Sequence, residues 1–387
     1  CHAPIGGDGD GHAGLIGRGQ SVDCHSRWQI PMSTDERKAR IESALLNIWY
    51  SGQKPGLVTG LTLGLLECTY KALRWATRQN YKSIAAKKAS HPPVLVVGNL
   101  IAGGAGKTPI VMAICQYMVA RGDKVGIVSR GYGRSTTAPI VIDPAKNTPA
   151  AIEAGDEPLF LSRETGCPVA VCADRNQAVR LLLAHFPDLK LIVSDDGLQH
   201  HKLARQIEWV VFDRRAHGNG RLLPAGPLRE PLSRLGSVDA VLCSNISPEA
   251  LGKALDWPSR DNWYAVHVQL TGFRQLSSGQ FLTTEQAMEQ WKPLKLMAFS
   301  GIGDPGKLFD AIRSAGLNLD ASRGLPDHFN YPEDFCAQFD QQVLITSGKD
   351  AVKLGDSNPK VWVAEISVKL PPALTQALED CIGPTID

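Results

Sequence analysis

Short apolar runs alternate with longer stretches of mixed polarity from residue 94 onward. Three of the longer stretches, residues 108–121, 157–165 and 175–186, have the length and mixed polarity of a helix. The apolar runs have the length of buried strands and lie at 94–97, 125–128, 139–142, 169–171, 189–193, 208–212 and 240–242. Short buried strands that alternate with helices are typical of a mostly parallel sheet. We therefore expect an α/β fold with helices on both faces of the sheet.

A second, smaller α/β unit is predicted after residue 262. Its expected strands and helix lie at 264–270, 296–299, 307–315, 343–346 and 361–366. Linker-like sequence flanks this unit near 248–262 and 371–372. The expected segments are a leader that is disordered or foreign to the working protein (1–31), an N-terminal helical segment (32–90), a core (91–262), a smaller α/β domain with linker strands (263–370) and a C-terminal segment that returns to the core (371–387).

The N-terminal segment has a distinct pattern. Residues 41–81 predict one or two helices with an interruption at 52–56. The uncharged apolar stretch 55–66 is too short to cross a bilayer, which needs about twenty residues. No acidic residue occurs between Cys68 and Val97, where basic residues accumulate. An apolar stretch beside cations is typical of a helix in a membrane interface, but a helix packed on its own domain with a solvated basic face has the same pattern.

Composition excludes several classes of protein. Of 387 residues, 43% are hydrophobic and 21% charged, which excludes a wholly disordered chain. Lys and Arg total 41 against 39 Asp and Glu, a net charge of +2. We expect no nucleic-acid partner, because nucleic-acid binders usually carry a strong basic excess. The nine cysteines include no CxxC pair, so neither a zinc site nor a disulfide framework is expected.

The strongest chemical signal is a glycine-rich sequence between the expected strand at 94–97 and the helix at 108–121. Glycines allow backbone N–H groups to point at a phosphate, and the helix N-terminus adds a favourable dipole. Lys107 would neutralise the β- and γ-phosphates, and the Thr108 hydroxyl would bind Mg²⁺. Ile101 stands where GxxxxGK[ST] has glycine, and a structural turn with a surface lysine is the alternative. The predicted nucleotide-binding residues are Gly103, Gly104, Ala105, Gly106, Lys107 and Thr108.

Acidic and polar side chains follow the expected strand at 189–193. Asp195 and Asp196 lie at its carboxyl end, where ligands bind in open α/β sheets, and Gln199 and His200 come directly afterwards. An acid at this place can hold Mg²⁺ or its water. The alternative is an Asp-Gly turn that closes the strand.

Other polar positions have two interpretations each. Asp156 either caps the helix that follows it or is a general base near the γ-phosphate. The arginines of 129–134, and Arg229 with Glu230 in a proline-rich loop, either bind anionic substrate groups or are loop residues. His328 alone would more often be structural than catalytic.

Taken together, these segments resemble the tetraacyldisaccharide 4′-kinases, the lipid A 4′-kinases of the Gram-negative envelope. The resemblance runs from about residue 48 to 369. It rests on 98–99 leading into 103–109, then 129–133, 155–158, 195–200, 223–230, 298–303 and 326–328. Ile101 agrees with that family. Gly348 departs from it, because the family commonly has glutamate there before Lys-Asp-Ala-Val-Lys, so we assign no role to that acid here.

The resemblance implies transfer of the γ-phosphate of ATP to the 4′-hydroxyl of a tetraacyldisaccharide 1-phosphate. It also implies a P-loop domain over 91–262, a smaller α/β domain joined to it by two strands, and an N-terminal helix at the cytoplasmic face of the inner membrane. Asp156 would accept the hydroxyl proton, His328 would orient it, and Lys107 would bridge the phosphates. The implied Mg²⁺ ligands are Thr108, Asp195, Asp196, Gln199 and Glu230; the implied substrate contacts are Arg130, Tyr132, Arg134, His200 and Arg229. A P-loop kinase for a soluble small molecule and a membrane-associated nucleotide-switch ATPase are the alternatives.

Overall fold

The computed structural model describes residues 34–81, 92–146, 149–355 and 358–382. The described residues from Glu42 onward belong to one compact unit, and residues before it to another. The expected leader at 1–31 lies outside the described residues. Two helices come first, α1 (Thr34–Tyr50) and α2 (Leu57–Tyr81), so the expected interruption is present at 51–56.

A mostly parallel sheet forms the core. Its middle strand, β1 (Val94–Gly98), is buried along its whole length between β5 (Leu191–Asp195) and β6 (Ile207–Phe212). The described strands follow the order β8-β7-β6-β1-β5-β2-β4-β3, and every neighbour is parallel except β3 to β4. The remaining strands of this part are β2 (Val125–Ser129), β3 (Ile140–Ile142), β4 (Val169–Val171) and β7 (Ala240–Ser244). The expected fold class is confirmed.

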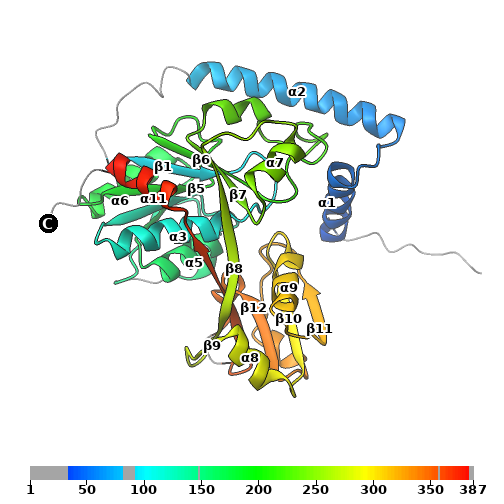
Figure 1. The fold of residues 1–387 in the computed structure, drawn as a ribbon, viewed down its shortest axis with the longest axis vertical. Helices are drawn as coiled ribbons and strands as arrows, with labels where there is room; N and C mark the ends of the chain where they lie inside the picture. The colour runs from blue at the N-terminus through cyan, green and yellow to red at the C-terminus, as the bar shows by residue number, and fades with distance from the viewer. Residues whose placement is uncertain (1–33, 82–91, 147–148, 356–357, 383–387) are drawn as a thin grey trace, which may run out of the picture. The chain divides into compact units, whose positions relative to one another are not determined.

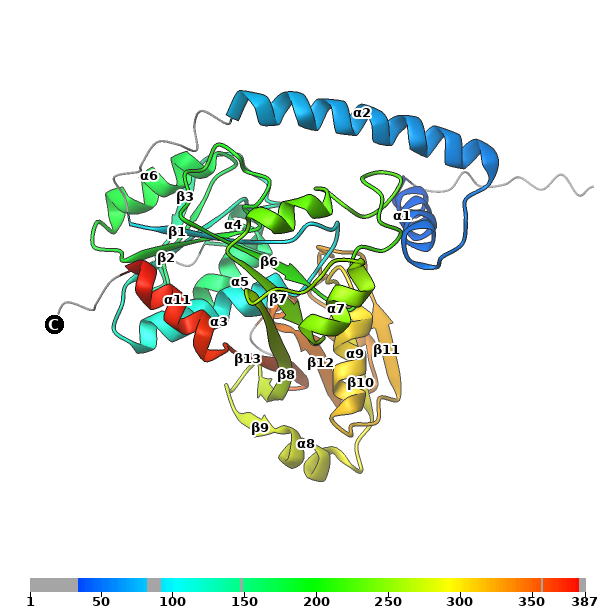
Figure 2. The ribbon, with the colours of Figure 1, turned by 45° about the horizontal axis from the view of Figure 1, so that its top comes forward.

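Helices cover both faces of this sheet. The chain moves from β1 to β2 and β4 through α3 and α5, and returns from β4 to β5 through α6. Because such crossovers are right-handed, α6 lies on the opposite face from α3 and α5 (Figure 2). The helices of this part are α3 (Lys107–Ala120), α4 (Ala151–Ala154), α5 (Asp156–Thr165), α6 (Arg175–His185), α7 (Pro248–Leu255) and the 3₁₀ helix η1 (Leu232–Ser237).

Two long strands lead into the smaller domain. β8 (Trp263–Gln275) pairs with β7 through its first residues and then runs antiparallel to β13 (Val361–Lys369), as Figure 1 shows. The smaller sheet continues in the order β13-β12-β10-β11, and β9 pairs with β8. Its other elements are β9 (Phe281–Thr283), α8 (Thr284–Trp291), β10 (Leu296–Ser300), α9 (Pro305–Ser314), β11 (Ala321–Gly324), η2 (Phe335–Gln338), β12 (Val343–Ser347) and α10 (Gly348–Ala351).

The last helix, α11 (Pro372–Ile382), packs on the larger domain. Leu374 and Leu378 are buried in the same apolar cluster as β1. Glu379 pairs with Arg121 at the end of α3, with 2.6 Å between Oε1 and Nη1. The chain therefore crosses to the smaller domain on β8 and comes back on β13 and α11.

α2 contacts the rest of the protein through polar side chains. Glu67 is buried and lies 2.7 Å from Arg221 Nη2. Arg74 Nη2 donates to Glu230 Oε2 at 2.8 Å. The inner face of this helix is therefore held by ion pairs.

The outer face of α2 is apolar and exposed. The large apolar side chains on it are Leu57, Val58, Leu61, Leu65, Leu66, Leu73 and Trp75, with exposed fractions between 52% and 81%. Of the two basic side chains that the structure describes on this helix, Lys71 is 54% exposed, whereas Arg74 is turned inward. No helix in the described part of the chain is long and apolar enough to span a bilayer.

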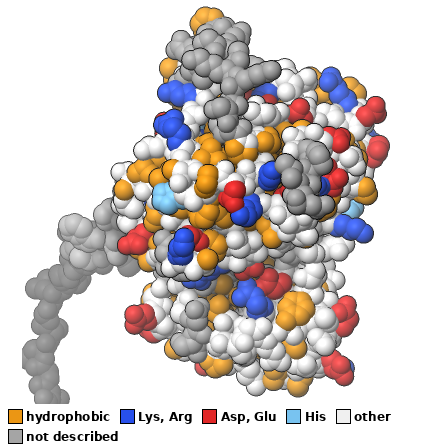
Figure 3. Space-filling model, turned by 90° about the vertical axis from the view of Figure 1, so that its left-hand side faces the viewer, with side chains coloured by type: hydrophobic (Ala, Val, Ile, Leu, Met, Phe, Trp, Pro, Cys, Tyr) orange, Lys and Arg blue, Asp and Glu red, His pale blue; other side chains and the backbone are white. Residues whose placement is uncertain are grey.

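On the face drawn in Figure 3, basic and acidic side chains are interspersed rather than gathered by sign.

Candidate active site

The loop between β1 and α3 forms a cradle of backbone N–H groups. Gly103 and Gly106 have φ angles of +92° and +80°, which side-chain-bearing residues rarely adopt. Asn99 Nδ2 donates to the Gly103 carbonyl at 3.0 Å and fixes the curve of the loop. α3 begins at Lys107 without a side-chain cap. Its first N–H groups are thus available to an anion, and this fits a polyphosphate chain.

Two side chains at the start of α3 point along this cradle. Lys107 Nζ lies 3.2 Å from Asn99 Oδ1 and 3.4 Å from Asp196 Oδ1, and its side chain is only 11% exposed. Thr108 Oγ1 donates to Glu157 Oε1 at 2.7 Å. Lys107 is therefore not a surface lysine beside a structural turn.

Asp195 and Asp196 lie at the end of β5, beside the cradle. Asp195 is buried, and its Oδ1 atom has no hydrogen-bond partner within the described residues. Burial, followed by the charges of Glu157 and Asp196, raises the pKa of Asp195 well above its usual range. Burial alone would also raise the pKa of Asp196, but Lys107 and Arg229 outweigh it and lower that pKa.

These groups fit a magnesium ion. A buried carboxylate oxygen without a partner, near a threonine hydroxyl and a phosphate cradle, is the donor set that Mg²⁺ uses with nucleotide phosphates. Among the residues that the structure describes, no group of three or more His, Cys, Asp or Glu side chains could hold a metal ion. Phosphate oxygens of a bound nucleotide would supply further ligands.

Asp156 faces the smaller domain. It is the first residue of α5, whose N-cap is Gly155 and carries no side-chain cap, so the helix-cap interpretation does not hold. Its Oδ2 atom lies 3.0 Å from His328 Nδ1. His328 has a φ angle of +60°, which is uncommon for histidine, and its ring lies 5.2 Å from the Tyr132 ring.

The electrostatics favour a charged Asp156–His328 pair. Burial would raise the pKa of Asp156, but the hydrogen bond from His328 and the charge of Lys353 outweigh it and lower that pKa. The hydrogen bond to Asp156 raises the pKa of His328 despite burial. The Asp156 carboxylate is thus ionised near neutral pH and held in place, which suits a proton acceptor.

Three lysines of the smaller domain reach the larger one, and sequence reasoning assigned none of them. Lys349 pairs with Glu157, which is the residue that binds Thr108. Lys353 Nζ lies 3.1 Å from Asp156 Oδ2. Lys307 Nζ donates to the carbonyl of Gly104 in the cradle at 3.1 Å. Lys349 and Lys353 belong to the Lys-Asp-Ala-Val-Lys segment already noted, whereas no sequence signal marks Lys307.

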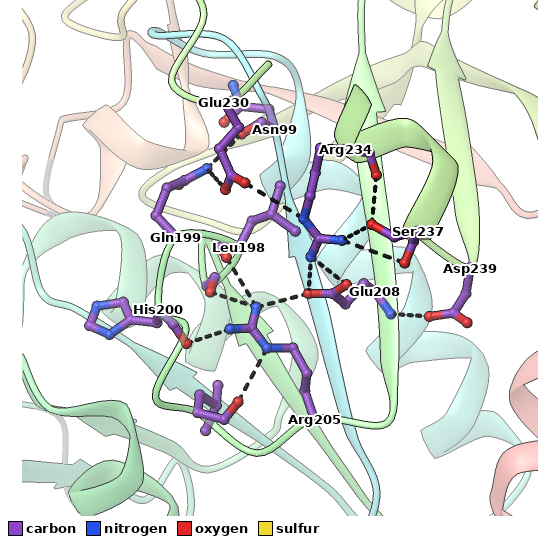
Figure 4. A network of polar contacts seen from close by, with 12 residues as sticks. Asn99, Leu198, Gln199, His200, Arg205, Glu208, Glu230, Arg234, Ser237 and Asp239 are labelled. Atoms are coloured by element: carbon purple, nitrogen blue, oxygen red, sulfur yellow. Dashed lines mark hydrogen bonds and ion pairs between the residues drawn. The ribbon is translucent and has the colours of Figure 1, made fainter. Parts of the chain in front are cut away.

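Glu230 sits among cations (Figure 4). Its carboxylate is buried, lies 2.8 Å from Arg74 and 3.6 Å from Arg234, and accepts a hydrogen bond from Gln199 Nε2 at 3.3 Å. Gln199 Nε2 also donates to the Asn99 carbonyl at 3.2 Å. Gln199 and Glu230 thus support the loop next to the cradle. Their assignment as Mg²⁺ ligands stays a prediction.

The remaining expected substrate contacts are placed unequally. Arg229 Nη1 lies 3.2 Å from Asp196 Oδ2 and belongs to the site. His200 is half-buried, and burial, followed by Arg175 and Arg130, lowers its pKa to about 4. Arg134 instead donates to two carbonyl groups of its own loop, at 2.7 and 3.1 Å. Arg130 and Tyr132 are exposed at the same end of β2.

Comparison with known proteins identifies the family. The model of the tetraacyldisaccharide-1-P 4′-kinase (LpxK) family matches residues 60–383. The tetraacyldisaccharide 4′-kinase of Dechloromonas aromatica is 41% identical over 75% of this chain and 84% of its own length. That of Bordetella parapertussis is 39% identical over 72% and 79%. The crystal structure of LpxK from Aquifex aeolicus in complex with ATP has the same fold, with a TM-score of 0.68 and 24% identity over 84% of this chain and all of its own. The resemblance predicted from the sequence is confirmed, and the chain belongs to the tetraacyldisaccharide-1-P 4′-kinase family.

Proposed function

We propose that this protein is a kinase that transfers the γ-phosphoryl group of ATP to the 4′-hydroxyl of a tetraacyldisaccharide 1-phosphate, a lipid A precursor. One connection carries the proposal beyond family membership. Thr108, at the end of the phosphate cradle, hydrogen-bonds Glu157, and Glu157 directly follows Asp156. A bound triphosphate and a proton acceptor would therefore be neighbours.

The cradle and its flanking side chains would hold the nucleotide. Backbone N–H groups of Gly103–Thr108 would donate to the phosphates, and Lys107 would exchange its contacts with Asn99 and Asp196 for phosphate oxygens. Thr108, Asp195 and Asp196 would hold Mg²⁺, with Gln199 and Glu230 as further expected contributors. When bound, Mg²⁺ supplies neutralisation of the charge on the phosphate oxygens.

Asp156 would take the proton released in the transfer. The 4′-oxygen forms a bond to the γ-phosphorus while the bond from that phosphorus to the β–γ bridging oxygen breaks, and ADP leaves. The hydroxyl proton passes to the Asp156 carboxylate, which His328 orients. In such reactions, positioning and charge neutralisation supply most of the reduction in the activation free energy.

The active site draws on both domains. Asp156 comes from the larger domain, and His328 from the smaller one. Lys349 and Lys307 of the smaller domain contact Glu157 and the Gly104 carbonyl. Chemistry would therefore require both domains to be in contact, and this limits wasteful hydrolysis of ATP.

The outer face of α2 would rest in the cytoplasmic leaflet of the inner membrane. Its exposed leucines and Trp75 can partition into the interface, whereas Glu67 and Arg74 keep the inner face attached to the protein. A multi-acyl acceptor remains in the bilayer, so the kinase must meet it there. Arg229, with Arg130, Tyr132, Arg134 and His200, would contact its anionic and sugar groups.

Transfer of label from [γ-³²P]ATP to a purified tetraacyldisaccharide 1-phosphate in mixed micelles tests the proposal. We expect labelled lipid from the wild-type protein with Mg²⁺ and none from Lys107→Ala. Label that appears only as free phosphate would instead indicate a nucleotide switch. Label on a soluble acceptor without any on the lipid would indicate a small-molecule kinase.

A further inference from the structure

Asp156 has a second cationic partner besides His328. Lys353 Nζ lies 3.1 Å from Asp156 Oδ2, and His328 Nδ1 lies 3.0 Å from the same oxygen. Among the described residues, both of these contacts are made to Oδ2. The other oxygen, Oδ1, can therefore face an acceptor hydroxyl while Oδ2 is held from two sides.

Lys353 is itself held by a buried carboxylate. Its Nζ atom lies 3.5 Å from Oδ1 of Asp350, which is completely buried. Asp350 Oδ2 accepts hydrogen bonds from Ser300 Oγ and Ser347 Oγ, both at 2.6 Å, and the backbone N–H of Gly301 donates to the same carboxylate. Ser300 and Ser347 end two adjacent strands, β10 and β12. The lysine is thus anchored on the rigid edge of the smaller sheet.

The surroundings of Lys353 fix the position of its Nζ atom. Its side chain is 8% exposed, and Nζ lies 5.3 Å from the centre of the Tyr331 ring. It also lines a cleft of about 390 Å³, together with Arg163 of α5 and Tyr331. Small solutes can enter such a cleft.

We propose that Lys353 is a positioning residue of the phosphoryl transfer, which holds the Asp156 carboxylate ionised and turned so that Oδ1 receives the acceptor proton. This inference rests on the function proposed above. The transferred proton ends on Asp156. The contacts run from the strand ends of the smaller domain to the larger one. Ser300 and Ser347 bind Asp350, Asp350 contacts Lys353, and Lys353 contacts Asp156. The smaller domain thus fixes the position of the proton acceptor of the larger domain.

Several charged or titratable groups adjoin Asp156 or contact its partners and its neighbour Glu157, and any pH test must consider them. From the larger domain they are Glu157 and Tyr132; from the smaller domain they are Asp327, His328, Tyr331, Lys349 and Asp350. Lys353 and His328 are the two whose contacts with Asp156 lower its pKa. Loss of Lys353 should therefore protonate Asp156 at a higher pH.

The decisive kinetic variant is Lys353→Ala, compared with Lys353→Arg and with Lys360→Ala at an exposed site of the same domain. We expect kcat to fall about 10- to 100-fold at pH 7 and the acidic limb of the pH profile to move up by about one unit, with KM for ATP unchanged. Lys353→Arg should leave the pH of the acidic limb unchanged, because arginine keeps the positive charge. Lys360→Ala should behave as wild type. An equal loss at every pH would overturn the proposal.

Chemical rescue separates charge from packing in the same variant. Lys353→Ala leaves space for n-propylammonium next to the cleft. We expect n-propylammonium to raise the kcat of Lys353→Ala by about fivefold or more, whereas n-propanol, which is similar in size but uncharged, should not raise it. Equal effects of the amine and the alcohol, or of neither, would contradict a role for the positive charge.

A measurement without turnover keeps this test independent of the proposed function. The imidazole of His328 is titrated by NMR in wild type and in Lys353→Ala. Because the two cations share one carboxylate oxygen, we expect removal of Lys353 to raise the pKa of His328 by about half a unit or more. An unchanged His328 titration would refute the shared contact. If the His328 pKa shifts as expected but the wild-type protein labels no lipid, the proposed kinase function is refuted and the shared contact is not.

Discussion

The Nδ1 atom of His328 lies 3.0 Å from Oδ2 of Asp156, although the two residues are 172 positions apart and belong to different domains. The contact places the imidazole of the smaller domain on the first residue of α5. It joins Asp156 to His328 only when the domains meet. Under the proposed function, phosphoryl transfer would therefore depend on contact between the two α/β domains.

Replacement of the proposed proton acceptor should affect chemistry more than nucleotide binding. For Asp156→Ala we expect kcat to fall about 10²- to 10⁴-fold, the usual contribution of a general base. The Asp156 side chain contacts His328 and Lys353 rather than the cradle, so the Kd for a fluorescent ATP analogue should stay within about twofold of wild type. Near-normal turnover would remove Asp156 from this role.

The domain contact should weaken as the pH rises above neutrality. The pKa of His328 is raised above 6.5, so its protonated form stabilises the folded protein fully below pH 6.5, and this contribution is lost as pH rises through the raised value. The pKa of Asp156 is lowered below 3.8, so its contribution is present above pH 3.8 and is lost as pH falls through the lowered value.

The pair is thus strongest between about pH 4 and 6.5. We expect the difference in Tm between wild type and His328→Asn to shrink between pH 6.5 and 9. Asn is chosen because it tolerates the positive φ. His267→Asn, at an exposed site on β8, is the control and should show no such trend. A constant difference for His328→Asn would contradict the charged pair.

Gly348 should not tolerate a side chain while Phe160 is present. A Cβ atom at Gly348 would lie 2.2 Å from Cε2 of the Phe160 ring, which packs from α5 against the start of α10. Overpacking of this kind costs about 1–3 kcal/mol, so Gly348→Ala should lower the free energy of unfolding by that amount.

A smaller side chain opposite should relieve this clash. In Gly348→Ala with Phe160→Leu, we expect the combined loss to be at least about 1 kcal/mol smaller than the sum of the two single losses. Denaturant titration of the four proteins measures this difference. Simple additivity would mean that the ring does not limit position 348.

The exposed leucines of α2 should control membrane binding. Burial of a leucine side chain stabilises by about 1.5–3 kcal/mol, so Leu61→Glu and Leu65→Glu should each weaken partition into phosphatidylglycerol-containing vesicles at least about tenfold. Phe281→Glu is the matched control, because Phe281 is an exposed aromatic residue of the smaller domain. Vesicle co-sedimentation gives the readout. Equal losses for all three variants would point to a general charge effect.

The core sheet was predictable because both of its faces are covered. Residues such as Val96 and Val193 lie in short runs rich in apolar residues, and the structure places them in β1 and β5. The two linking strands were predicted too short. β8 and β13 are partly exposed along their shared length, and polar residues such as Thr271 interrupt their apolar pattern.

The cradle was predictable for a similar local reason, since the glycines and Lys107 are adjacent in sequence. The place of Lys353 and Lys349 in the site could not be predicted from the sequence. Both lysines contact residues of α5, and these contacts form only after the two domains fold and meet. The orientation of α2 was also beyond the sequence. Its pattern permits a basic face in solvent, and the ion pairs of Glu67 with Arg221 and of Arg74 with Glu230 show which face is turned inward.

A crystal structure with Mg²⁺ and a non-hydrolysable ATP analogue tests the central claim most directly. We expect the triphosphate to lie in the loop of residues 103–108, with Lys107 Nζ on its phosphate oxygens and its terminal phosphate turned toward Asp156. An empty loop with the nucleotide bound elsewhere would contradict it.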